Sequence, residues 1–201
     1  MDIAKEYIEG LKKAHFDIGY EKYWEHFEET VHGADKEDIK KLREAYPDVP
    51  DSLIQLLEIM DGTYYREYAG EKIIFYVLGS DEEEVPYCLL SVAQMLKAKE
   101  KEELDWLENY LNREYEVEID EKIINNAEYM CWLPLSGDNF ASRLFIDFSP
   151  SGQGTKGQIV RFTHDPDELV VIAEDFDDYL EMVMDREFDF VNEENMDSYE
   201  Y

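Results

Sequence analysis

The stretch that decides the fold spans residues 144–162 and reads LFIDFSPSGQGTKGQIVRF. Its three glycines follow the G-x-G-x-x-G spacing of a dinucleotide-binding loop, and Gly152 and Gly157 have the spacing of a P-loop. Both loops lead into a helix whose N-terminal amides hold phosphate. Here an apolar run, residues 158–163, follows instead, and Gln158 stands where a P-loop has its lysine. The pattern therefore predicts a β-hairpin with a glycine-rich connection and disfavours a nucleotide site.

Similar patterns on either side of this hairpin predict the remaining elements. Short apolar runs are frequent in the second half, whereas apolar residues at helical spacing dominate the first half. The predicted strands are residues 72–78, 128–133, 143–148, 158–163 and 169–172. The predicted helices are residues 3–11, 20–31, 35–45, 51–60, 91–112 and 174–184. Helices, then strands, then a helix, with few βαβ units, indicate an α+β fold.

The strongest compositional feature is negative charge. The 201 residues include 50 acidic and 19 basic ones, which gives a formal net charge of −31. Such a field repels nucleic acids and anionic membranes, whose phosphates require basic side chains, and it attracts basic proteins. The alternative interpretation is that the charge serves solubility alone. Acidic residues are dense in the segment Asp81–Glu84 and again in residues 174–201.

Signals for secretion and membrane insertion are missing from this sequence. The first ten residues, MDIAKEYIEG, lack the basic and apolar parts of a signal peptide. No apolar run reaches the roughly 20 residues that cross a bilayer. Cys88 and Cys131 lie among apolar residues and form no Cys-x-x-Cys pair, so we expect two small packed side chains and no disulfide or zinc site. We therefore expect a cytoplasmic protein.

Sequence signatures of catalysis and metal binding are also missing. The four histidines are widely scattered, and the chain has no Gly-x-Ser-x-Gly nucleophile motif. Residues 175–179, DFDDY, begin like a calcium loop but lack its glycine. They are better interpreted as the first turn of the last helix, where carboxylates favour the positive end of the helix dipole. We expect no catalytic residues, cofactor or metal.

Several segments match the motif order of a known family. The most specific are Trp132-Leu-Pro134-Leu, Leu144-Phe-Ile-Asp147, Pro150, Gly154 and Gly157-Gln158-Ile. Further upstream, a proline precedes the helix SLIQLLEIMDG, and further downstream VIAEDF precedes the last helix. Over roughly residues 33–190 the chain resembles the SUKH superfamily, which includes fungal cell-wall-assembly regulators and many bacterial immunity proteins.

The helices at residues 1–32 are an addition to the family pattern and are expected to pack on the core as an extension, and the composition of residues 192–201 predicts an acidic flexible tail. For the SUKH-like domain at 33–191, the resemblance implies a central, mostly antiparallel sheet of about five or six strands flanked by helices. It also implies a binding role and no catalysis. The residues that match family positions are expected to be mainly structural: Trp132, Pro134, Asp147, Pro150, Gly154, Gly157 and Gln158.

Charge and resemblance together favour an immunity protein that neutralises a cognate toxin by direct binding, with a nuclease as one kind of target. An acidic surface can occupy or flank the basic groove with which a nuclease holds nucleic acid. The expected partner-binding residues are Asp81, Glu82, Glu83, Glu84, Asp138, Asn139, Asp175, Asp177 and Asp178. The alternative is a regulatory or scaffold protein related to the cell-wall-assembly regulators. An enzyme on a diverged scaffold is a third hypothesis, supported only by the abundance of carboxylates. Oligomeric state is left open.

Overall fold

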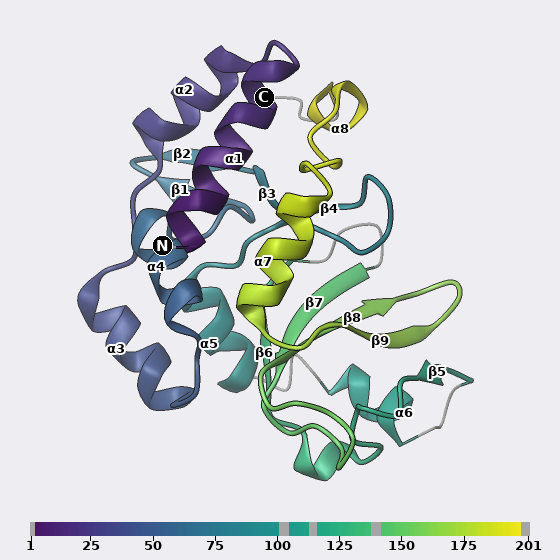
Figure 1. Cartoon of the computed structure of the whole chain (residues 1–201). Coiled ribbons are helices and arrows are strands. Elements are labelled where there is room, and N and C mark those ends of the chain that lie inside the picture. The colour runs from purple at the N-terminus through teal and green to yellow at the C-terminus, as the bar shows by residue number, and fades with distance from the viewer. Residues whose placement is uncertain (1–2, 101–104, 113–115, 138–141, 198–201) are drawn as a thin grey trace.

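The computed structural model describes residues 3–100, 105–112, 116–137 and 142–197. Its helices include most of those predicted, and Figure 1 shows the N-terminal ones gathered on one side of the molecule. Their bounds are α1 Ile3–Asp17, α2 Glu21–Thr30, α3 Lys36–Ala45, α4 Asp51–Ile59, α5 Val92–Glu100, α6 Trp106–Leu111, the 3₁₀ helix η1 Ala127–Tyr129, α7 Phe176–Asp185 and α8 Glu193–Asp197.

The largest sheet has five strands in the order β5-β9-β8-β7-β6. All neighbouring pairs are antiparallel except β5 and β9, which are parallel, so the predicted α+β fold with a mostly antiparallel sheet is confirmed. The strands are β5 Glu118–Ile119, β6 Trp132–Pro134, β7 Ser142–Asp147, β8 Gln158–Thr163 and β9 Glu168–Ala173. β7 and β8 pair along their full lengths, which confirms the hairpin predicted from the glycine-rich stretch.

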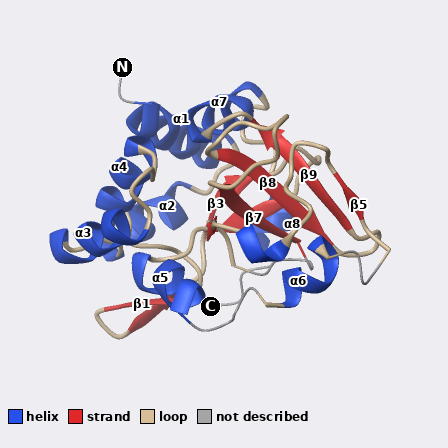
Figure 2. Ribbon diagram, turned by 90° about the horizontal axis from the view of Figure 1, so that it is seen from below, coloured by secondary structure: helices blue, strands red, loops and turns tan. Residues whose placement is uncertain are grey.

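Two short hairpins complete the strands, β1 Arg66–Tyr68 with β2 Glu71–Ile73 and β3 Tyr76–Gly79 with β4 Pro86–Cys88. The single strand predicted at 72–78 is therefore wrong, because the chain leaves β2 at Ile73 and begins β3 at Tyr76. The chain after β4 runs beside the chain after β6, where Leu89 bridges Ser136. Figure 2 shows the β1 hairpin projecting from the body of the molecule.

The sheet separates two apolar cores, because successive side chains along a strand point to opposite faces. On β8, Ile159 belongs to the larger core with residues of α1, α4 and α7, whereas Val160 and Phe162 belong to a smaller one with α6. Figure 2 shows α1 and α7 on one side of the sheet and α6 on the other. The predicted helix over 91–112 is thus found as two helices, α5 and α6, with residues 101–104 between them outside the described part. α5 packs in the larger core and α6 in the smaller one.

The N-terminal helices are integral to the larger core. Tyr7 of α1 is fully buried and donates a hydrogen bond of 2.7 Å to the carbonyl of Val77 in β3. Trp24 and Phe27 of α2 pack around Phe75, with the Phe27 and Phe75 ring centroids 4.0 Å apart. Removing α1 and α2 would therefore expose aromatic surface of the domain they cover.

The predicted flexible tail is wrong for part of its length. Residues 193–197 form α8, and the side chain of Met196 is only 3% exposed within the larger core. Asn192 accepts a hydrogen bond of 2.9 Å from the Asn195 amide and so caps the helix. The burial of Met196 holds this segment on the core although its polar composition indicated a solvated tail. Residues 198–201 lie outside the described part.

The buried His15 gives the fold a sensitivity to acid. Its ring is 0% exposed, lies 5.1 Å from the Phe75 ring and places Nδ1 2.9 Å from the Leu11 carbonyl oxygen. Burial lowers the pKa of His15 to about 4, although the hydrogen bond with Leu11 opposes this shift. The unfolded chain, with an ordinary pKa of 6.5, therefore binds more protons than the folded protein between those values. Stability is lost as pH falls through that window.

We expect His15→Phe to remove this part of the acid sensitivity, because a phenyl ring fits the aromatic cluster and does not titrate. Between pH 7 and pH 5, the wild type should lose roughly 2 kcal/mol more unfolding free energy than the variant. Urea denaturation followed by circular dichroism at both pH values measures the difference. Parallel pH profiles for the two proteins would contradict the assignment to His15.

Candidate protein-binding site

The site centres on a charged residue inside an apolar strand. β8 reads QIVRFT, and Arg161 lies between Leu144 of β7 and Val170 of β9 on the face that carries Ile159. The Arg161 side chain is 5% exposed. A guanidinium at that depth is tolerated only where carboxylates pair with it and satisfy its donors.

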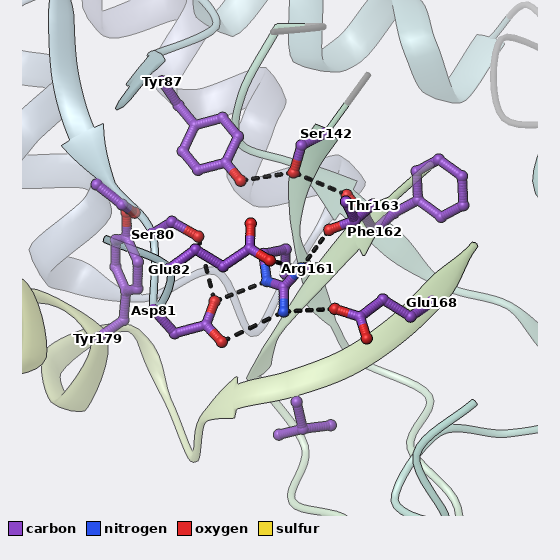
Figure 3. A network of polar contacts seen from close by, with 12 residues as sticks. Ser80, Asp81, Glu82, Tyr87, Ser142, Arg161, Phe162, Thr163, Glu168 and Tyr179 are labelled. Atoms are coloured by element: carbon purple, nitrogen blue, oxygen red, sulfur yellow. Dashed lines mark hydrogen bonds and ion pairs between the residues drawn. The ribbon is translucent and has the colours of Figure 1, made fainter. Parts of the chain in front are cut away.

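Three carboxylates surround Arg161, two from the β3–β4 loop and one from β9 (Figure 3). Nε lies 2.7 Å from Asp81 Oδ1, Nη1 3.2 Å from Glu82 Oε1 and Nη2 2.7 Å from Glu168 Oε1. Nη1 also donates to the hydroxyl of Thr163. Burial by itself lowers the pKa of Arg161, but the hydrogen bonds to Asp81 and Glu168 raise it above its ordinary value, so the guanidinium stays charged.

Neutral hydrogen bonds fix the strands that carry the β3–β4 loop. Tyr179 of α7 donates to the Gly79 carbonyl over 2.7 Å at the end of β3. Tyr87 of β4 lies 2.6 Å from the hydroxyl of Ser142, which donates to the Phe162 carbonyl over 2.9 Å. Both strands of the β3–β4 hairpin are thus attached to their neighbours, and Arg161 holds the loop between them.

The far side of the loop is attached to the C-terminal segment. The Glu84 amide donates to Asp189 Oδ2 over 3.4 Å, and the Glu84 carbonyl accepts from the Asn195 side chain over 2.8 Å. Glu84 itself has a φ of 61°, in the left-handed region, which allows this tight turn. The side chains of Glu83 and Glu84 are exposed and form no ion pair with the described residues.

The structure divides the predicted partner-binding residues into separate groups. Asp81 and Glu82 bind Arg161, and Glu83 and Glu84 face solvent beside them. The other predicted carboxylates are on α7, and Asp138 and Asn139 lie outside the described residues. Within the described residues, no hydrogen bond or ion pair joins the α7 carboxylates to the β3–β4 loop.

The predicted carboxylates near α7 lie at the N-terminus of this helix, as the sequence predicts. Asp175 is the N-cap, and its Oδ1 accepts from the Asp178 amide over 2.9 Å. Asp177 and Asp178 are exposed in the first turn. Repulsion from Asp175, added to by Glu174 and Asp177, raises the pKa of Asp178. This group therefore has an evident structural role in addition to its charge.

The family-matching polar residues form a buried network at the loop between β7 and β8. Asp147 and Gln158 are 0% exposed and joined by a bond of 2.9 Å from Gln158 Nε2. Gln158 also donates to the Lys122 carbonyl over 3.0 Å, and Ser149 donates its amide to Asp147 over 2.7 Å. Burial raises the pKa of Asp147, which these hydrogen bonds oppose. The network closes the hairpin loop onto the chain before η1.

The remaining motif residues shape the same region. A Cβ at Gly154 would lie 2.4 Å from the Lys122 carbonyl oxygen and 2.8 Å from Pro150, and Gly157 has a φ of 95°, so both positions require glycine. Trp132 is 2% exposed and packs 5.3 Å from the Phe145 ring. Pro134 lies on β6, at the edge of the five-stranded sheet, where a missing amide is tolerated. Each therefore has a packing or backbone role in the fold.

Sequence reasoning missed Arg161 and Glu168 as parts of the site. The available signal was the arginine within QIVRFT, since a charged residue in a buried strand requires partners of opposite charge. The partners were not recognisable, because Asp81 lies 80 residues away in the chain and Glu168 comes near Arg161 only through the pairing of β8 with β9.

Comparison with known proteins agrees with this architecture. The model of the SMI1/KNR4 family (SUKH-1) matches residues 33–182. A search of curated proteins found no match. Because the family match covers well over half of the chain, the α+β domain is a SUKH-type domain and the chain belongs to the SMI1/KNR4 family. In addition, within the described residues no helix is long and apolar enough to span a membrane.

We expect Arg161→Met to destabilise the protein by roughly 2 kcal/mol, because it leaves three neighbouring carboxylates, 24–42% exposed, without the cation that they share. Arg43→Met is the matched control, since Arg43 pairs with Asp51 at 2.6 Å but the two side chains are 43% and 82% exposed. That control should cost less than about 1 kcal/mol. Urea denaturation measures both, and equal costs would show that the Arg161 network adds no stability.

Proposed function

We propose that this protein is an immunity protein that neutralises a cognate toxin by binding it, without catalysis. Membership of the SMI1/KNR4 family supports an immunity or regulatory role in broad terms. The finer proposal rests on charge, because a protein with a net charge of −31 associates fastest with a basic partner. A nuclease toxin is such a partner, since its active groove must attract phosphates.

The observation that carries the proposal is the anchored acidic loop between β3 and β4. Arg161 neutralises part of the charge of Asp81 and Glu82, and the loop then presents Glu83 and Glu84 to solvent on a fixed backbone. A loop that is ordered before binding loses little conformational entropy when a partner docks. Carboxylates held in this way can oppose the basic side chains of a toxin and exclude its substrate.

The binding mechanism needs no group beyond the protein's own side chains. Carboxylates on the β3–β4 loop attract the partner from a distance, and this attraction weakens as salt screens it. Close contact then covers the partner's groove. The proposal places the protein in the cytoplasm, where it would meet a nuclease before that enzyme reaches nucleic acid.

Affinity capture followed by a toxicity assay tests the proposal. The tagged protein is incubated with an extract of its own cells and eluted in steps of rising salt. We expect one dominant basic protein that is toxic when expressed alone and harmless when this protein is expressed with it. Many weakly held proteins with no toxic activity would reject the immunity proposal and favour the regulatory alternative.

The acidic loop can be tested on the captured partner with Glu83→Lys/Glu84→Lys. The double variant should lower the association rate at low salt about tenfold or more and flatten its dependence on salt. Asp81 and Glu82 are left unchanged, because replacing them would also break the Arg161 network. Surface plasmon resonance at several salt concentrations measures the rate.

The control for this variant is Glu67→Lys/Glu121→Lys, which changes the net charge equally at exposed positions outside the loop. Its association rate should fall much less. If both double variants slow association equally, overall charge and not the β3–β4 loop attracts the partner. Urea denaturation of each variant shows whether the fold is intact.

A further inference from the structure

A pocket lies where the N-terminal helices meet the family domain. Its cavity is about 110 Å³, and its walls come from Ile8 of α1, Trp24 and Phe27 of α2, and Ile59 at the end of α4. Figure 1 shows these three helices side by side. The family match begins at residue 33, so the walls contributed by α1 and α2 belong to the N-terminal helices that precede it. The family-matched residues alone do not form this pocket.

The pocket is apolar with one charged residue among its lining residues. Trp24 is 1% exposed and Met60 0%, whereas Ile59 is 37% exposed. Glu28 is the charged group, and its side chain is 46% exposed. The size suits one aliphatic side chain, and the carboxylate suits a cation next to it.

The charged group at the pocket is a carboxylate, which can pair with a cation on a ligand. Glu28 binds Lys12 Nζ over 2.9 Å with both oxygens. Burial acts to raise the pKa of Glu28, but the contacts with Lys12 and the Trp24 indole lower it below its ordinary value, so the carboxylate is charged at neutral pH.

The existing Lys12–Glu28 pair does not block such a ligand. Both side chains are about half exposed, at 40% and 46%, and pairs of this kind contribute little net stability. Lys12 also lies 5.6 Å from the ring of Phe16, which is 37% exposed. Exposed apolar side chains thus lie both in the pocket, at Ile59, and beyond the ion pair, at Phe16.

We propose that this pocket binds an aliphatic side chain from a basic segment of a partner protein, with Glu28 pairing the neighbouring lysine or arginine. The charge of this chain favours that occupant, because a net charge of −31 attracts basic segments. A second copy of the chain would carry the same −31 and be repelled. The site lies on helices separate from the acidic loop, so it does not depend on toxin neutralisation.

Short peptides of defined chemistry test the proposal on the intact protein. The probes are acetyl-Lys-Leu-Lys-amide, acetyl-Lys-Ala-Lys-amide and acetyl-Glu-Leu-Glu-amide, and the readout is the methyl NMR shifts of Ile8, Ile59 and Met60. We expect saturable shifts with the Lys-Leu-Lys peptide, and roughly tenfold weaker binding when alanine replaces leucine, because the pocket loses its apolar contact. The acidic peptide should not bind.

Two substitutions with opposite expected effects test the role of Glu28. Glu28→Gln should weaken binding of the Lys-Leu-Lys peptide about threefold to tenfold, whereas Lys12→Gln should strengthen it by releasing Glu28. The matched controls, Glu29→Gln and Lys22→Gln, make the same charge changes at exposed neighbours on α2 and should alter binding less than twofold.

Each contrary result overturns a defined part of the proposal. Equal binding of the leucine and alanine peptides would show attraction by net charge without use of the pocket. Equal binding of the Lys-Leu-Lys and Glu-Leu-Glu peptides would show that the pocket binds leucine by apolar contact alone and that Glu28 does not select the charge of the ligand. Absence of methyl shifts with all three peptides would reject the site, and none of these outcomes bears on the capture of a toxin.

Discussion

The guanidinium of Arg161 connects the sheet to the surface of this protein. It is 5% exposed and is compatible with the sheet because Asp81, Glu82 and Glu168 supply carboxylates within 2.7–3.2 Å. The first two come from the β3–β4 loop, so the need to neutralise a buried charge also determines where that loop lies. The acidic loop is therefore not simply a solvated connection, and of its four carboxylates those of Glu83 and Glu84 form no ion pair with the described residues.

A second constraint comes from the fact that the sheet has apolar residues on both faces. The larger core requires α1, α4 and α7, and the smaller requires α6, because each exposed apolar face must be covered. Tyr7 and Tyr179 add directional bonds from α1 and α7 to β3. The N-terminal helices α1 and α2 are thus part of the same core as the SUKH-type domain. The pocket lies where these two helices contact the end of α4.

The carboxylates of this protein differ in whether they have a partner within the fold. Asp175 caps α7, Asp147 is buried with Gln158, and Asp81 binds Arg161. These carboxylates have local partners that account for their positions. The carboxylates of Glu83 and Glu84 form no ion pair with the described residues, in a chain whose net charge is −31. These exposed carboxylates and the family membership are what support the proposal of a basic protein partner.

The sequence alone determined the features that depend on neighbouring residues. Apolar periodicity and glycine spacing were sufficient for the β7–β8 hairpin, a last helix beginning near Glu174 and the α+β class, because strand alternation, helical spacing and turn residues act over a few positions. Only the tertiary structure decided that β3 pairs with β4, that Met196 is buried, and that Asp81 meets Arg161. The Asp81–Arg161 pair and the packing of Met196 join segments far apart in the chain, and the β3–β4 pairing depends on the elements that cover it. The free energy that selects these contacts comes from burial and charge pairing between elements, which a local sequence pattern does not reveal.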